Sequence, residues 1–207
     1  MAPPALIPSI PRPDTRNPFA GKGLAVTLAL LLQPTEAQSI ADLAARAEAS
    51  RPLASKVVRE LRRLELVAGE VRQGKQGELW PTPALLQATA SHWPAPIASV
   101  VGGQARLESL PTGGGPAIRR LLSVNWDSPP RVYVRDLNAA RGVLAESGGH
   151  LIGGGTGDWE IAVVDFPFGP GDVPPVVAAL ELGATPRGRE MLARHRSDFA
   201  DGWRSDG

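Results

Sequence analysis

The sequence contains no cysteine among its 207 residues. This absence excludes disulfide bonds, thiolate catalysis, and zinc or iron–sulfur sites with cysteine ligands. Histidines are also few, and His92, His150 and His195 are too scattered to form a set of metal ligands. The sequence therefore predicts neither a metal ion nor a cofactor.

Long hydrophobic runs are absent as well. The longest, at residues 24–32, is much shorter than the roughly 20 residues that span a bilayer, so it is expected to form a buried helix. The first residues lack the basic stretch and continuous apolar segment of a secretory signal. We expect a cytoplasmic protein with no membrane partner.

The chain also has almost no net charge. Its formal value is +1, so any affinity for nucleic acid has to come from a local basic patch. The five prolines among residues 1–17 favour an extended, flexible arm. The segment Pro-Ala-Pro at residues 94–96 predicts a boundary between two domains, 18–93 and 94–207.

The first of these domains has a pattern of helices followed by a hairpin. Ser39 is expected to cap the second helix, with Asp42 three residues later, and Pro52 suits the first turn of the third. Helical spacing is found over 24–33, 39–49, 52–65 and 83–93, and strand-like segments at 67–72 and 78–80 flank a glycine-bounded turn. This order predicts a winged helix-turn-helix domain.

The third helix, within SRPLASKVVRELRRLELV at residues 50–67, combines an apolar stripe with positive charge. At about 100° per residue, the side that packs on the core is expected to carry Leu53, Val57, Leu61 and Leu64. The other side offers donors that suit guanine edges and phosphates, although a charged face of this kind is often only solvated. We expect DNA contacts from Arg51, Ser55, Lys56, Arg59, Arg62 and Arg63 of the helix and from Arg72, Lys75 and Gln76 of the wing.

The same stretch resembles the recognition-helix segment of bacterial winged-helix regulators, where a basic helix ends in a leucine-rich turn and the first wing strand. The resemblance implies that this helix enters the major groove of double-stranded DNA. Winged helices also occur as protein-interaction modules, and that alternative stays open.

Residues 94–207 predict a small α/β domain, which makes the whole chain mixed α/β (α+β). A strand is expected at 131–134, a helix at 137–146, a glycine-interrupted strand or hairpin at 150–168, and closing helices at 174–182 and 186–199. We expect this domain to serve dimerisation or binding of a protein partner.

The end of the chain resembles AbiEi-type antitoxins and related regulators over residues 163–195. The matching features are Pro174-Pro175, the run AALEL at 178–182 and the sequence RGRE at 187–190. The resemblance implies a two-domain DNA-binding regulator that represses its own operon.

An enzyme is the rival interpretation. Asp158 and Glu160 follow a glycine cluster and are spaced so that both point to one side of a strand, as in nucleotidyltransferases that bind divalent metal ions. The glycines lie too close to these acids to begin a phosphate-binding helix, and a hairpin turn with solvated acids at a strand start is the simpler explanation of the cluster. We therefore expect a transcriptional repressor and not an enzyme, binding DNA as a homodimer.

The expected roles of Arg59 in base contact and Lys75 in phosphate contact can be tested with two substitutions. Arg59→Ala should relax specificity at about one base pair, at a cost of ~1–3 kcal/mol, because Arg59 is expected to read a base. Lys75→Ala should weaken binding to all sequences alike, because it is expected to hold a phosphate. Dissociation constants on the preferred and on random duplexes distinguish the two, and equal losses for both variants on both duplexes would refute this division.

Overall fold

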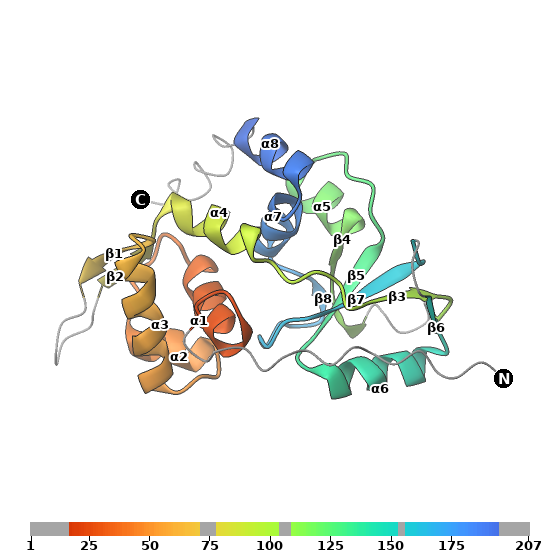
Figure 1. The fold of residues 1–207 in the computed structure, drawn as a ribbon, viewed down its shortest axis with the longest axis horizontal. Helices are drawn as coiled ribbons and strands as arrows, with labels where there is room; N and C mark the ends of the chain where they lie inside the picture. Colours follow the sequence, from red (N-terminus) through yellow and green to blue (C-terminus); the bar gives the residue numbers. More distant parts are fainter. Residues whose placement is uncertain (1–16, 71–77, 104–108, 153–155, 195–207) are drawn as a thin grey trace. The chain divides into compact units, whose positions relative to one another are not determined.

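The computed structural model describes residues 17–70, 78–103, 109–152 and 156–194 (Figure 1). These residues form two compact units. The helical unit contains the described residues of Pro13–Trp93 and Ala179–Gly207, and the sheet unit contains those of Pro94–Ala178. The mixed helix and strand class is as predicted. None of the helices in the described ranges is long and apolar enough to cross a membrane.

The helical unit begins with three helices and a hairpin. Its elements are α1 (Gly21–Leu31), α2 (Ile40–Arg46), α3 (Arg51–Arg63), β1 (Val67–Glu70), β2 (Glu78–Pro81) and α4 (Pro83–Ser91). β1 and β2 pair antiparallel, and Figure 1 shows this hairpin directly after the end of α3. The elements thus follow the order that the sequence predicts.

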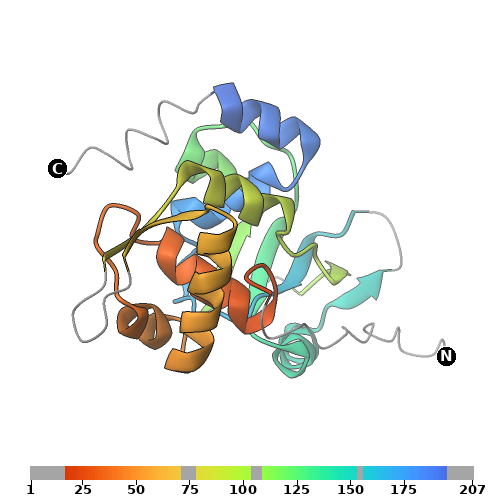
Figure 2. The ribbon, with the colours of Figure 1, turned by 60° about the vertical axis from the view of Figure 1, so that its left-hand side comes forward.

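α1 forms the centre of this unit. Its residues from Gly23 to Leu31 are buried without a break, which explains why the sequence shows a continuous apolar run there and no alternating pattern. α2 and α3 pack around it. α2 is seen nearly end-on in Figure 2 while α3 lies across the view, so the two helices cross at a steep angle.

The connection between α2 and α3 is a tight turn. Four residues separate Arg46 from Arg51, and Glu48 adopts a left-handed conformation with φ 48°. The amide of Ala49 donates to the carbonyl of Ala44 at 2.8 Å, which closes the end of α2 as in a Schellman motif. A short, hydrogen-bonded turn thus joins the two steeply crossed helices.

The end of the described chain belongs to the helical unit, whereas the sequence prediction kept all of residues 94–207 together. The boundary between the units falls within α7 (Pro175–Gly183), and α8 (Pro186–Arg194) follows it. A Cβ atom at Gly183 would lie 2.9 Å from both Ala90 of α4 and Leu192 of α8. These three helices therefore approach one another closely at a residue without a side chain.

The sheet unit is built on six strands in the order β6-β3-β7-β5-β4-β8. Their bounds are β3 (Ala98–Val101), β4 (Pro111–Gly114), β5 (Pro130–Val134), β6 (His150–Ile152), β7 (Trp159–Val163) and β8 (Gly171–Asp172). α5 (Gly115–Leu122) and α6 (Leu137–Ser147) lie on opposite sides of β5 in Figures 1 and 2. The predicted strand at 131–134 and helix at 137–146 correspond to β5 and α6.

Of the glycine-interrupted strand and the hairpin expected at residues 150–168, the hairpin is wrong. β6 and β7 each pair antiparallel with β3, which lies between them, and β7 pairs parallel with β5. Trp159 is fully buried in the core of this sheet, and its indole Nε1 donates to the carbonyl of Gly102 at 2.7 Å. β3, at residues 98–101, therefore lies between β6 and β7, although the sequence pattern did not indicate a strand there.

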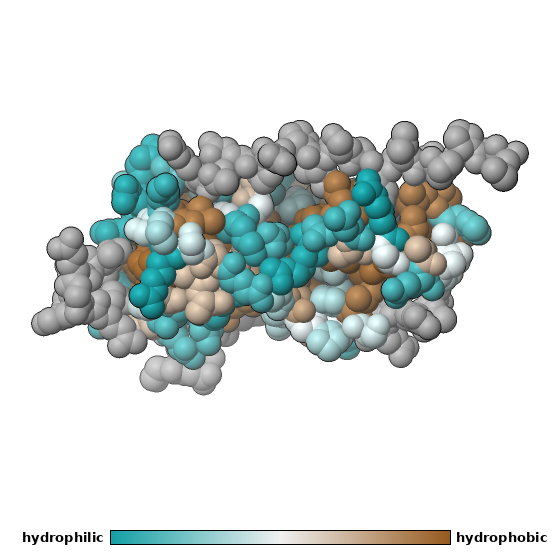
Figure 3. Space-filling view, turned by 90° about the horizontal axis from the view of Figure 1, so that it is seen from below, coloured by the Kyte–Doolittle hydropathy of each residue, from teal (hydrophilic) through white to brown (hydrophobic). Residues whose placement is uncertain are grey.

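Hydrophobic and hydrophilic residues are mixed on the face of the described residues that Figure 3 draws. On the face drawn in Figure 3, hydrophobic residues form small groups separated by hydrophilic ones. Among the described residues, the large hydrophobic side chains classed as exposed are Leu64 and Val101. Leu64 lies at the end of α3, next to the basic residues.

The cap of α2 provides a test of local stability. Asp42 N donates to Ser39 Oγ at 3.2 Å while Ser39 N donates to the Asp42 carboxylate at 3.1 Å, so both halves of the predicted capping box are present. Ser39→Ala should lower the free energy of unfolding by about 1 kcal/mol, measured by urea denaturation followed by circular dichroism.

This contribution should depend on pH. The hydrogen bond from the Ser39 hydroxyl, and then that from its backbone, lower the pKa of Asp42. Because the folded pKa lies below the unfolded one, this stabilisation is complete above the unfolded value of about 4 and is lost as pH falls through the folded value. The difference between Ser39→Ala and the wild type should shrink in acid. Ser91→Ala, at an exposed serine of α4, is the matched control and should change stability little at any pH.

Candidate nucleic-acid interface

α3 carries its basic residues on the surface. Arg51, Lys56, Arg59, Arg62 and Arg63 are all exposed, and Ser55 is half-buried. Within the described ranges, Arg51, Lys56, Arg59 and Arg62 make no side-chain hydrogen bond or ion pair. Donors of these side chains are therefore available to a ligand.

The buried side of α3 is rotated from the predicted one. Ala54, Val57, Val58 and Leu61 are the buried residues, whereas Leu53 is half-buried and Leu64 is 39% exposed. The buried side is therefore centred near Ala54 and Leu61, and it is turned away from Leu53 and Leu64. At 100° per residue, Lys56, Arg59 and Arg63 then lie opposite the core, and Ser55 and Arg62 lie on one flank. Arg51, in the first turn, lies nearer to the side of Ala54.

Local sequence fixes where α3 begins and ends. Ser50 Oγ accepts from the amide of Leu53 at 3.4 Å, and Pro52 occupies the first turn, where its missing N–H costs no hydrogen bond. After the last turn, Glu65 is left-handed with φ 58°, and the amide of Leu66 donates to the carbonyl of Leu61 at 2.9 Å. This turn directs the chain into β1.

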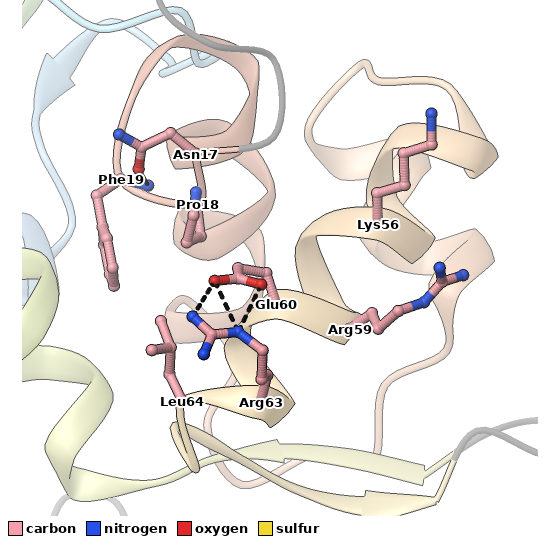
Figure 4. Close-up of a pocket in the computed structure, with 8 residues that line it drawn as sticks. All are labelled: Asn17, Pro18, Phe19, Lys56, Arg59, Glu60, Arg63 and Leu64. Carbon is pink, nitrogen blue, oxygen red and sulfur yellow. Dashed lines mark hydrogen bonds and ion pairs between the residues drawn. The ribbon is translucent and has the colours of Figure 1, made fainter.

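An open groove of about 810 Å³ runs beside α3 (Figure 4). One wall comes from the segment before α1 and the other from α3 and its end, and the lining residues are Asn17, Pro18, Phe19, Lys56, Arg59, Glu60, Arg63 and Leu64. Phe19 stacks on His92 with ring centroids 4.6 Å apart. In Figure 4, Phe19 and Leu64 lie on one side of the groove, and Lys56 and Arg59 extend to the other.

An ion pair lies in the middle of this lining. Arg63 Nη2 donates to Glu60 Oε1 at 2.6 Å, and Arg63 Nε lies 3.0 and 3.1 Å from the two carboxylate oxygens. The hydrogen bond from Arg63 lowers the pKa of Glu60, and the bond to Glu60 raises that of Arg63. Both groups are therefore charged near neutral pH, and Arg63 differs from the other cations of α3 in having a partner.

A buried amide secures the surroundings of α3. Gln38, 2% exposed, pairs through its backbone with Leu79 of β2, with N–O distances of 3.1 and 3.3 Å. Its Nε2 donates to the carbonyls of Leu30 at 2.9 Å and Gln33 at 2.6 Å, and its Oε1 accepts from Arg46 of α2. One residue thus joins the end of α1, α2 and the hairpin that follows α3.

Some predicted site residues cannot be placed, and some site residues were missed. Arg72, Lys75 and Gln76 of the predicted wing lie outside the described residues. Conversely, the sequence analysis did not select Glu60, although its spacing of three residues from Arg63 is typical of helix ion pairs. It also missed Asn17–Phe19 as a wall of the groove, because no pattern in the sequence relates that segment to α3.

The acids of the enzyme alternative have structural partners. The Asp158 carboxylate accepts from the amide of Gly102 at 2.7 Å. Glu160 accepts from Arg131 Nη2 at 2.7 Å and from its Nε at 3.0 Å, in a largely buried pair between β7 and β5. In the ranges that the structure covers, no group of three histidine, cysteine or acidic residues could hold a metal ion.

No protein-family model, no curated protein and no solved structure matches this chain. The resemblance to antitoxins stays a prediction from the sequence.

The role of Gln38 can be tested by mutation. Gln38→Ala should lower the free energy of unfolding by about 2–4 kcal/mol, because it removes three side-chain hydrogen bonds and leaves a buried carbonyl of α1 without a donor. Gln33→Ala is the control, because its exposed side chain also accepts from Arg46 but serves no buried group; it should cost less than about 1 kcal/mol. Urea denaturation of both variants measures the difference. Equal losses in the free energy of unfolding would show that Gln38 does not have this role.

Proposed function

We propose that the protein binds double-stranded DNA with sequence specificity and acts as a transcriptional repressor in the cytoplasm. The observation that carries the proposal is the set of exposed cations on α3 without partners among the described residues, Arg51, Lys56, Arg59 and Arg62. Cations that are not engaged within the protein can donate to phosphates and base edges without first breaking an internal bond.

The elements around α3 support the same function. α3 follows α2 through a four-residue turn at a steep crossing angle and precedes an antiparallel hairpin. In a winged helix-turn-helix, the helix in this position lies in the major groove and the hairpin lies beside it. We assign the helical unit to this class on the order and packing of its elements.

The positions of the side chains suggest separate roles. Arg59 lies opposite the core and Arg62 beside it, and a guanidinium in the major groove donates two hydrogen bonds to O6 and N7 of guanine. Lys56, a compact point charge, suits a phosphate. We propose Arg59 and Arg62 as base readers and Lys56 as a phosphate contact, with the wing adding phosphate contacts.

A repressor commonly binds as a dimer, because two-fold symmetry doubles the contacts on a pseudo-palindromic operator. We propose a homodimer on this ground, and we assign dimerisation or partner binding to the sheet unit. Repression of its own operon, as in the antitoxins that the chain end resembles, is part of the same proposal.

Binding to a protein instead of DNA is the second candidate. The groove beside α3 favours it, because Leu64 exposes apolar surface there next to Phe19. Such binding would depend little on salt, whereas DNA binding releases counterions and weakens steeply as salt rises.

A DNA titration at two salt concentrations tests the proposal. The full chain should bind genomic fragments that include its own promoter, with an affinity that falls by a slope of about 0.9 in log K per log salt for each phosphate contact. Arg59→Ala/Arg62→Ala should lose about 2–6 kcal/mol on the preferred fragment if the two base contacts add.

The matched control removes the same charge elsewhere. Arg141→Ala/Arg187→Ala changes exposed arginines of α6 and α8, and it should retain specific binding. Failure of the wild type to bind DNA at low salt, or equal losses for both double variants, would contradict the assignment of α3 and direct attention to protein partners.

A further inference from the structure

α3 carries an acidic residue among its basic ones. Between Arg51 and Arg63 the helix carries five basic residues and a single acid, Glu60. Its side chain is 36% exposed and lines the groove together with Lys56 and Arg59. A carboxylate on a DNA-facing helix repels phosphates, so Glu60 does not contribute to general affinity for DNA.

Glu60 is held in one orientation. Arg63 contacts both carboxylate oxygens through Nε and contacts Oε1 also through Nη2. An exposed ion pair at this spacing stabilises a helix by only a few tenths of a kcal/mol, so its contribution to stability is small. Its effect is to fix an acceptor at a defined place on the surface of α3.

The ion pair leaves hydrogen-bonding groups of both residues unused. A carboxylate only accepts hydrogen bonds and has about four lone-pair sites, of which Arg63 occupies only some. The Nη1 group of Arg63 donates to no acceptor in the described part of the chain. The pair therefore presents an acceptor and a donor next to each other.

This combination complements bases that present an amino donor in the major groove. Adenine N6 and cytosine N4 are both such donors, and the usual partner of an acidic side chain is cytosine N4. In the major groove, cytosine offers an N4 amino donor and its partner guanine offers O6 and N7 acceptors. Phosphates have no donor, so the carboxylate distinguishes a base edge from the DNA backbone. Lys56 and Arg59, by contrast, can bind phosphates as well as bases.

We propose that Glu60, positioned by Arg63, reads the N4 amino group of a cytosine in a C·G pair of the target DNA. The inference rests on the proposed function, because it requires α3 to enter the major groove. It adds a residue whose role is specificity and which lowers affinity for DNA in general.

The test compares base preferences position by position. The wild-type full chain is used to select a preferred duplex from a randomised library, and its dissociation constant is then measured on every single base-pair variant of that duplex. At one position, cytosine should be preferred by about 5- to 150-fold. Glu60→Gln and Glu60→Ala should each abolish the cytosine preference there, and both should bind random duplexes more tightly than the wild type.

Controls separate this inference from the proposed function. Arg62→Ala should lose preference at a different position and keep the cytosine preference. Thermal unfolding of both Glu60 variants should match the wild type, because the pair is exposed. If the Glu60 variants keep every base preference and only bind all duplexes more tightly, the carboxylate acts as a general charge and the inference is overturned. If the wild type binds no duplex at low salt, the proposed function fails together with it.

Discussion

The side-chain amide of Gln38 is the interaction on which the helical unit depends. It is buried, and an amide without partners at such a place costs several kcal/mol. Its hydrogen bonds to the end of α1 and to Arg46, together with the backbone pairing to Leu79, satisfy that requirement and link α1, α2 and β2. α3 packs on α1 and α2 within this unit.

The basic surface of α3 is a consequence of this packing. Once Ala54, Val57, Val58 and Leu61 are buried, helix geometry leaves Lys56, Arg59 and Arg63 on the opposite side. The surface is not uniform, because Glu60 engages Arg63 and leaves the other cations of the helix available. In the proposed interface, Lys56 contributes general affinity, and Arg59, Arg62 and Glu60 contribute specificity.

Much of the helical unit could be predicted from the sequence, and less of the sheet unit. The capping box at Ser39, the proline at the start of α3 and the hairpin depend on residues a few positions apart, and the structure has each of them. β3 and β4 were missed, because β4 is built partly from glycines and β3 shows no clear alternation. The wing residues of the candidate interface lie outside the described residues, and its helix residues lie on α3 as predicted.

The sequence by itself determined that α1–α4 and α6–α8 become helices and that α3 is amphipathic and basic, because helical periodicity and capping chemistry are local. It did not predict α5. Only the tertiary structure decided which residues of α3 are buried, that β3 separates β6 from β7, and that α8 groups with the first helices. These outcomes depend on contacts between residues far apart in the chain. No local pattern encodes such contacts, because the shapes of both partners select them.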